Sequence, residues 1–162
     1  MRLKWTGYYP GIIGKVTELH AAYYHKHWNF DMSFEAQVAR ELSAFFVNFH
    51  EKRDGFWAVS ANGTFAGAVA VDGQLSDTEG ARLRWFIVEP ELQGLGIGKL
   101  LIEKAVTFCG KTGHRKIFLW TFRGLDAARH LYDSEGFKLV DEHSVDQWGG
   151  KINEQKFELK CL

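Results

Sequence analysis

Two helical patterns occupy the first third of this chain. Apolar residues recur at three- and four-residue steps from Ile12 to Trp28, which predicts an amphipathic helix. Polar residues around Asn29 interrupt this pattern, and Ser33 can then cap a second helix whose wide apolar face lies between residues 34 and 49. A short strand is predicted within residues 2–9, so this third is expected to be mostly helical.

Strand patterns dominate the rest of the chain. Two apolar runs, 56–59 and 65–71, flank the pair Asn62-Gly63, which is typical of a tight β-hairpin turn. The later elements are predicted as a strand at 81–89, a helix at 97–112, a strand at 115–121, a short helix ending before Gly136, and a hairpin of 137–147 with 152–161. This order predicts an α/β fold with a mixed, mostly antiparallel central sheet flanked by helices. No repeat or linker interrupts it, so residues 1–162 are expected to form a single domain.

Composition narrows the class of protein further. Hydrophobic residues make up 46% of the 162 residues and aromatic residues 15%, which argues against a disordered chain. Lysine plus arginine equals aspartate plus glutamate at 20 each, so no nucleic acid or membrane surface is expected as a partner. No apolar run approaches the roughly 20 residues of a membrane span. Isolated cysteines at 109 and 161, without a signal-peptide pattern, favour a reducing, cytoplasmic location.

A glycine-rich segment at residues 93–98, Gln-Gly-Leu-Gly-Ile-Gly, joins the strand pattern 81–89 to the helix pattern 97–112. Such a turn favours anions, because the backbone can approach the ligand and the free N–H groups of the first helical turn point at it. The spacing excludes a P-loop, since Lys99 is followed by Leu100 rather than serine or threonine. It also lacks the third glycine of a dinucleotide fingerprint. The alternative is a helix start without a ligand.

Two motifs in this order and spacing resemble those of the GNAT superfamily of acyl-CoA-dependent N-acyltransferases. Gln93, Gly96 and Gly98 match its pyrophosphate loop, Gln-x-x-Gly-x-Gly. The segment 128–137 is similar to its last core helix, Ala-x-x-Leu-Tyr-x-x-x-Gly-Phe. The first third also resembles the acyltransferase modules fused to MarR-type regulators, but no winged-helix region precedes it here, so no DNA-binding role is expected.

The resemblance implies an N-acetyltransferase that moves an acetyl group from acetyl-CoA to the amine of a small molecule, with an amino-acid-like acceptor as one option. The amine would attack directly in a ternary complex. The resemblance also implies that the backbone of 86–88 pairs with pantetheine and stabilises the oxyanion, and that Tyr132 protonates the departing thiolate. The CoA-binding residues that it implies are Phe86, Ile87, Val88, Gln93, Gly94, Leu95, Gly96, Ile97, Gly98 and Lys99.

The general base is less well defined by the sequence. Glu79, which precedes the strand pattern 81–89, is the first candidate, and Glu18, His20 and Glu35 are the others. Each of them also fits a surface or packing role. The histidines at 20, 25 and 27 lack any recognised metal-ligand spacing, and no cysteine or carboxylate set completes them, so no metal is expected.

The acceptor site is predicted around two arginines. Strand alternation places Arg82 and Arg84 on one face, with Trp85 on the other. Buried arginines need an anion, which is either a carboxylate or phosphate of the acceptor or an acidic neighbour such as Glu79. Trp148, in the turn of the closing hairpin, is expected either to line the same pocket or to serve only as a turn residue.

A second interpretation keeps the fold without catalysis. Many GNAT proteins carry an asparagine shortly before the last helix, where it contacts pantetheine, whereas the equivalent place near Leu125 offers only Thr121 and Arg123. The missing asparagine and the undefined base leave a non-catalytic acyl-CoA-binding sensor or interaction module as the alternative. The expected partner is a small-molecule amine, and a homodimer is left open as the assembly.

Overall fold

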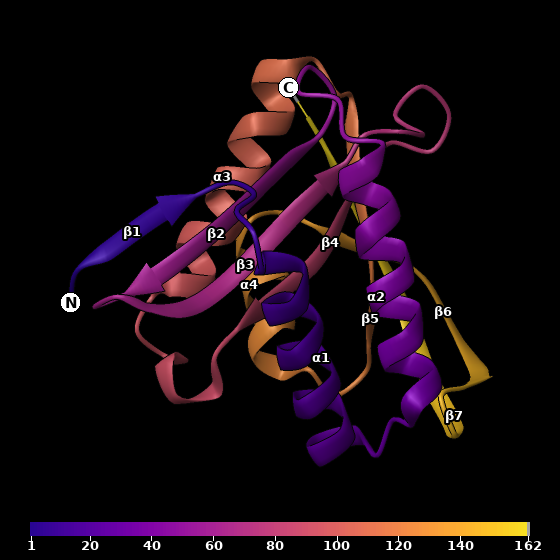
Figure 1. Cartoon of the computed structure of the whole chain (residues 1–162). Helices are drawn as coiled ribbons and strands as arrows, with labels where there is room; N and C mark the ends of the chain where they lie inside the picture. The colour runs from indigo at the N-terminus through magenta and orange to yellow at the C-terminus, as the bar shows by residue number, and fades with distance from the viewer. Residues whose placement is uncertain (162) are drawn as a thin grey trace.

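One seven-stranded sheet forms the centre of the molecule in a computed structural model that describes residues 1–161 (Figure 1). Its strands are β1 (Leu3–Thr6), β2 (Gly55–Ala61), β3 (Thr64–Asp72), β4 (Ala81–Val88), β5 (Lys116–Phe122), β6 (Lys138–Gln147) and β7 (Gly150–Lys160). They lie in the order β1-β2-β3-β4-β5-β7-β6, and of these neighbours only β4 and β5 are parallel. The predicted α/β class with a mixed, mostly antiparallel sheet is therefore confirmed.

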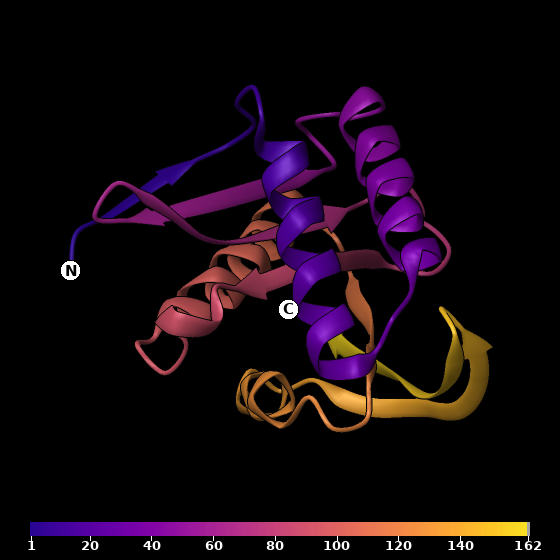
Figure 2. The ribbon, with the colours of Figure 1, turned by 60° about the horizontal axis from the view of Figure 1, so that its bottom comes forward.

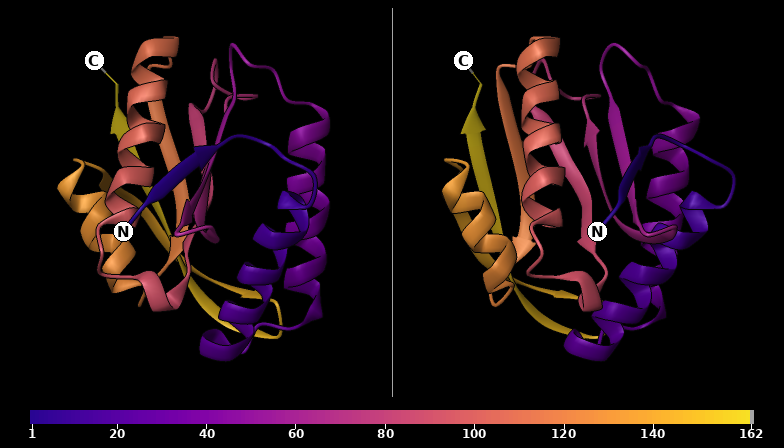
Figure 3. Two further views of the ribbon diagram at one scale, coloured as in Figure 1. Left: turned by 60° about the vertical axis from the view of Figure 1, so that its left-hand side comes forward. Right: turned by 90° about the vertical axis from the view of Figure 1, so that its left-hand side faces the viewer.

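Helices cover both faces of this sheet (Figures 2 and 3). They are α1 (Ile12–Trp28), α2 (Met32–Val47), α3 (Ile97–Thr112) and α4 (Asp126–Ser134), with a short 3₁₀ helix, η1 (Pro90–Leu92). The alternation of side chains along β3 shows which helices lie on which face. Ala68 and Ala70 pack in a core cluster with α1 and α2, whereas Val69 and Val71 pack in a second cluster with α3 and α4.

The cap of α2 differs from the prediction. Asp31 is the N-cap residue, and its Oδ1 accepts a hydrogen bond from the Ser33 backbone N–H at 2.9 Å. Because the helix already begins at Met32, the predicted Ser33 cap is wrong. An aspartate at this position satisfies a free N–H group and also places a negative charge at the positive end of the helix dipole.

A β-bulge interrupts β4 in its middle. The register with β3 shifts between Ala68 and Ala70, so β4 holds one extra residue at this point. Trp85 there adopts a left-handed backbone with φ of 49°. Its side chain turns to the α1–α2 face and packs against Phe45. The prediction that Trp85 faces away from Arg84 is therefore wrong, because a bulge breaks the two-residue period on which it rested.

The parallel strands β4 and β5 separate soon after they meet. Their ladder contains only two residue pairs, although β4 continues to Val88 and β5 to Phe122. Beyond Arg82 the facing edges of the two strands are no longer paired with each other. Main-chain donors and acceptors along such an edge can bind an extended ligand.

Candidate functional site

A cavity of about 1470 Å³ opens where β4 and β5 separate. Its wall contains residues of α1, α2, β4, β5 and α4, of the glycine-rich loop before α3, and of the turn between β6 and β7. Helices α1 and α2 lie on one face of the sheet and α4 on the other (Figure 3). Because residues of all three helices line the cavity, it extends to both faces of the sheet. We call residues 93–99 its loop end. We call the wall formed by α1, α2, β5, Arg82, Arg84 and Trp148 its aromatic end.

The loop end is built from main chain. Gly94 and Gly96 have φ of 83° and 88°, in the left-handed region that favours glycine. Gly96 is the N-cap of α3, and no side chain caps the first turn of this helix, so its N–H groups are available to an anion. Gly98 permits a close approach, because a Cβ there would lie 3.1 Å from Leu131 of α4 and 3.3 Å from Phe86 of β4.

Most of the predicted CoA-binding residues lie in the cavity wall. The exceptions are Leu95, which is exposed, and Ile97, which is buried in the core. The Gln93 side chain donates a hydrogen bond to the Val88 carbonyl at 3.3 Å, which ties the loop to the end of β4. The loop is therefore held beside the strand whose free edge opens into the cavity.

Tyr132 reaches the cavity from α4. Its side chain is packed between Phe86 and Phe157, with ring centroids 6.2 and 5.8 Å away, and the residue is 5% exposed. Burial raises the pKa of its phenol, so the hydroxyl stays protonated at neutral pH. Tyr24 of α1 lines the same cavity, and its pKa is raised by burial and by the nearby Tyr132.

The candidate bases lie in different places. Glu79 is exposed in the segment between β3 and β4, and Glu18 and Glu35 are exposed on α1 and α2. None of these three carboxylates lines the cavity, whereas His20 does. The structure therefore does not bring Glu79 to Tyr132, because Glu79 precedes the end of β4 that is paired with β5, whereas the cavity opens where the two strands separate.

His20 is a buried neutral imidazole in the aromatic end. Its Nδ1 lies 2.8 Å from the Val16 carbonyl, which only accepts, so Nδ1 carries the proton. Burial lowers the pKa of His20 to about 4, against a smaller opposing effect of this hydrogen bond. The ring is thus neutral at physiological pH. Within residues 1–161 its Nε2 has no hydrogen-bond partner, so this atom can accept one from a ligand.

The two predicted acceptor arginines differ in their partners. Arg84 forms ion pairs with Glu41 of α2 and, at 3.6 Å, with Asp72 of β3. Its guanidinium also stacks on Trp85, 4.2 Å from the ring centroid. Glu79 is not among these partners. The Arg84 charge is therefore already neutralised by carboxylates of the protein itself.

Arg82 has no such partner among the described residues. Its Nε is buried without a hydrogen bond, and no carboxylate of residues 1–161 lies within ion-pair distance. Burial lowers the pKa of Arg82 to about 10, with a smaller effect from Arg84, so it remains charged at neutral pH. It lines the cavity. Arg82 as a whole is half-buried, and a charged side chain that is partly removed from water without a counter-ion is stabilised by an anionic ligand.

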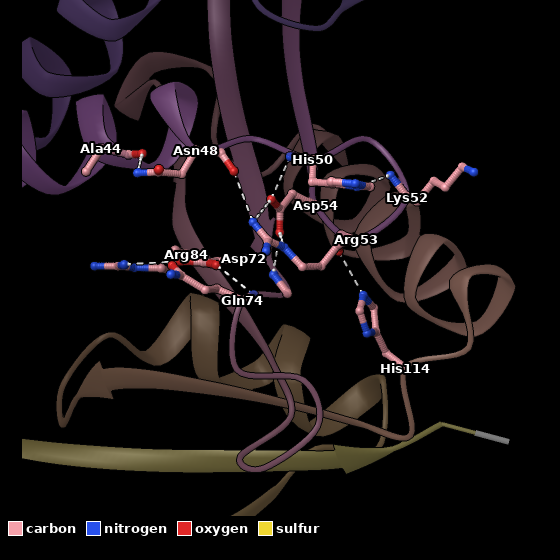
Figure 4. Close-up of polar contacts among 11 residues, drawn as sticks. Ala44, Asn48, His50, Lys52, Arg53, Asp54, Asp72, Gln74, Arg84 and His114 are labelled. Atoms are coloured by element: carbon pink, nitrogen blue, oxygen red, sulfur yellow. Dashed lines mark hydrogen bonds and ion pairs between the residues drawn. The ribbon is translucent and has the colours of Figure 1, made fainter.

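A network of polar contacts around Asp54 lies next to Asp72, one of the partners of Arg84 (Figure 4). The buried Asp54 accepts hydrogen bonds from the Arg53 guanidinium at 2.9 Å and from the Gly73 N–H at 2.7 Å. Burial on its own raises the pKa of Asp54, but these hydrogen bonds outweigh it and hold the pKa below its ordinary value. They fix the end of β3, from which Asp72 reaches Arg84.

Trp148 lies in the cavity wall at the tip of the β6–β7 hairpin. Its indole N–H donates to the Gln37 side chain at 2.9 Å, and its carbonyl accepts from the Asp31 N–H at 3.0 Å. Its ring packs on Phe30 and Phe34, with centroids 4.9 and 5.0 Å away. These contacts hold the hairpin tip against the junction of α1 and α2.

Further aromatic residues of the wall were missed by sequence reasoning: Tyr23, Tyr24, Trp28, Trp120 and Phe122. On α1 and β5 they follow helical and strand periods, which indicate packing rather than ligand contact. A usable signal was present, because five of the six side chains at 23–28 carry aromatic or imidazole rings. The buried face of one helix cannot accommodate five such rings, so some of them must face a cavity or solvent.

The segment where an asparagine is expected contributes apolar and hydroxyl groups instead. Thr121 and Leu125 line the cavity, and Arg123 points elsewhere and pairs with Glu142 at 3.8 Å. Within this segment, Thr121 and the main chain are therefore the polar groups that face the cavity.

Across residues 1–161, no three histidine, cysteine, aspartate or glutamate side chains come together as a metal-binding group. None of the described helices combines the length and the apolar character needed to cross a bilayer.

The chain is similar to known acetyltransferases in sequence. The model of the acetyltransferase (GNAT) family matches residues 14–137. The chain is 32% identical over 99 residues to an uncharacterised N-acetyltransferase of Methanocaldococcus jannaschii, with 59% of this chain and 43% of that protein covered. It is 32% identical over 105 residues to N-acetylaspartate synthetase of Xenopus tropicalis, with 63% and 38% covered. The chain thus spans about two fifths of the length of these curated relatives.

The fold itself also occurs among solved structures. An acetyltransferase of the GNAT family from Staphylococcus aureus superposes with a TM-score of 0.79. The match covers 99% of this chain and 100% of that one, at 16% sequence identity. At this level of identity the similarity shows a shared fold.

Proposed function

We propose, from the premise that this chain belongs to the GNAT acetyltransferase family, that it transfers an acetyl group from acetyl-CoA to the amine of a small molecule that carries a carboxylate. One observation carries this proposal. A single cavity joins the uncapped, glycine-rich start of α3 to the unpaired guanidinium of Arg82. The first feature suits a phosphate group, and the second suits an anionic acceptor.

The loop end and the strand opening fit the two parts of CoA. The pyrophosphate would accept hydrogen bonds from the N–H groups at the start of α3, where the helix dipole also favours negative charge. The pantetheine arm is extended and rich in amide groups. It would lie in the opening between β4 and β5 and bind, as an added strand, the edge of β4 at residues 86–88 that faces β5 and is not paired with it.

The chemistry then needs few groups from the protein. The amine nitrogen attacks the thioester carbonyl, and a main-chain N–H of residues 86–88 stabilises the resulting oxyanion. The tetrahedral intermediate then collapses: the C–S bond breaks, the new C–N bond remains, and Tyr132 gives its proton to the departing thiolate sulfur. The nitrogen loses one proton to solvent, from which Tyr132 is reprotonated. His20 Nε2 accepts a hydrogen bond from the amine and orients its lone pair.

The difference between the two arginines supports an anionic acceptor. Arg84 is neutralised by Glu41 and Asp72, whereas Arg82 has no ion pair, so a carboxylate of the acceptor would complete the site. The Xenopus relative is named for an N-acetylated amino acid, which supports an acceptor of this kind. An α-amino acid carries its carboxylate one atom away from the reactive amine.

The test combines binding with turnover. Calorimetry should show saturable binding of acetyl-CoA and CoA, and release of the CoA thiol should depend on an added amine. The amines to compare are amino acids, spermidine, an aminoglycoside and a peptide N-terminus. Absence of acetyl-CoA binding up to millimolar concentration would refute the assignment of the loop end. Binding without amine-dependent thiol release would identify the protein as a non-catalytic acyl-CoA sensor.

A further inference from the structure

The wall of the aromatic end exposes part of the ring surface of several aromatic side chains. Six aromatic side chains on it are only partly buried: Tyr23, Tyr24, Trp28, Trp120, Phe122 and Trp148. They come from α1, β5 and the β6–β7 turn, which are distant in sequence. Exposed apolar surface gathered around one concave site marks a place where a ligand buries it.

An inner aromatic layer holds part of this wall in place. The ring centroid of the buried Phe30 lies 5.5 Å from that of Tyr24, 5.5 Å from that of Phe122 and 4.9 Å from that of Trp148. The Tyr24 and Phe122 rings also contact each other, with centroids 5.9 Å apart. Trp148 is in addition fixed by its hydrogen bond to Gln37. The wall is therefore preformed, and a ligand that binds it does not have to order these side chains.

The charges at this end are few and mostly paired. The aromatic end has three charged residues, Glu41, Arg82 and Arg84, and of these Glu41 and Arg84 pair with each other. Two carboxylates behind the wall attract Arg82 from a distance, but Asp72 pairs with Arg84 and Glu154 contacts His143 at 3.2 Å. Arg82 is thus left as one cation for one carboxylate of the acceptor.

This pattern of charges discriminates between classes of amine. A polyamine or a lysine side chain would need a free carboxylate at the aromatic end, where the carboxylate of Glu41 is already paired with Arg84. An acidic amino acid would need a second free cation, and Arg84 is already neutralised. A side chain that is uncharged and aromatic meets neither obstacle, and it can stack on the exposed rings.

Resting on the acetyltransferase function proposed above, we infer that the acceptor is a free aromatic α-amino acid. Its carboxylate pairs with Arg82, and its amine donates to His20 Nε2. Its side chain lies against Trp28 and the neighbouring rings of the aromatic end. The reaction is the acyl transfer already described, so the products are an N-acetyl aromatic amino acid and CoA.

The experiment measures kcat/KM at saturating acetyl-CoA for phenylalanine, tryptophan, alanine, aspartate and spermidine. Phenylalanine and tryptophan should exceed alanine by about 100-fold, since one buried ring replaces a methyl group. Aspartate and spermidine should fall below them by a similar factor. Trp28→Ala should reduce the preference for phenylalanine over alanine at least about tenfold. The matched control is Trp5→Ala, because Trp5 is also partly buried but lies on β1 outside the cavity.

A binding measurement separates the failure of this inference from the failure of the proposed function. Phenylalanine is titrated by calorimetry into protein loaded with CoA, for the wild type and for Arg82→Met. Higher turnover of aspartate, alanine or spermidine than of phenylalanine would overturn the inference and leave the acetyltransferase function standing. Phenylalanine binding that needs Arg82, without turnover of any amine, would support the acceptor class and overturn catalysis. Neither binding nor turnover would overturn both.

Discussion

The two ends of the cavity are built from different parts of the chain. The loop end comes from one continuous stretch, residues 93–99, and offers main-chain N–H groups of α3. The aromatic end is assembled from α1, α2, β4, β5 and the β6–β7 turn, and it offers side chains. This difference indicates which end can determine the specificity for the acceptor. A backbone site depends on glycine and tolerates other changes, whereas a side-chain site can be altered one residue at a time.

The largest expected effect is the loss of the loop end. Gly96→Asp should weaken acetyl-CoA binding by about 100-fold or more, because φ of 88° strains any other residue and the carboxylate repels a phosphate. Gly110→Asp is the control, since Gly110 lies on the same helix and a Cβ there meets nothing within 4 Å. Calorimetry on both variants checks this, and equal affinities would remove the anion site from the start of α3.

Between the two ends, Tyr132 tests the proposed chemistry. Tyr132→Phe should lower kcat by about 100-fold and leave acetyl-CoA affinity nearly unchanged, because only the proton donor is removed. Tyr8→Phe is the control, since Tyr8 is exposed and outside the cavity. Single-turnover rates over a range of pH avoid interference from product release. A rate equal to the wild type at every pH would exclude Tyr132 as the acid.

The aromatic end should respond differently at its two arginines. Arg82→Met should raise KM for phenylalanine by about 10- to 100-fold and spare 2-phenylethylamine, which lacks the carboxylate. Arg84→Met should instead lower the melting temperature, because it leaves Glu41 and Asp72 without their partner. Steady-state kinetics and thermal unfolding of both variants are the measurements. Equal losses for the two amines in Arg82→Met would contradict a carboxylate contact.

The same difference explains which parts of the site were predictable. Glycine spacing reports a backbone conformation directly, so the residue types at 93–98 are enough to indicate an anion site. The periods of helix and strand likewise predicted the order of elements and the fold class. Both signals are local, and the local chain determines them.

Contacts between residues distant in the sequence could not be predicted from local patterns. Nothing in the sequence near Arg84 indicates that Glu41, on another helix, would neutralise it while Arg82 stays unpaired. The bulge at Trp85 depends on the register between β3 and β4, so alternation alone placed the indole on the wrong face. The homodimer, the cytoplasmic location and the roles of the individual site residues stay predictions.

The smallest expected effect concerns His20 and the pH dependence of stability. Burial lowers its pKa to about 4, while an unfolded histidine titrates near pH 6.5. As the pH falls, the histidine therefore takes up a proton in the unfolded state first, which favours unfolding. The stability that the neutral His20 contributes above pH 6.5 is lost progressively down to about pH 4. Between pH 7 and pH 5 this corresponds to a loss of about 1–2 kcal/mol in the free energy of unfolding.

Urea unfolding at the two pH values measures this loss, with His20→Gln as the comparison. The variant keeps a side chain that can donate to Val16 but cannot be protonated, so its stability should fall less than that of the wild type. His25→Gln is the matched control on the same helix, because His25 is exposed. An equal fall in wild type and His20→Gln would show that His20 is not the buried neutral ring on which the hydrogen bond to the amine depends.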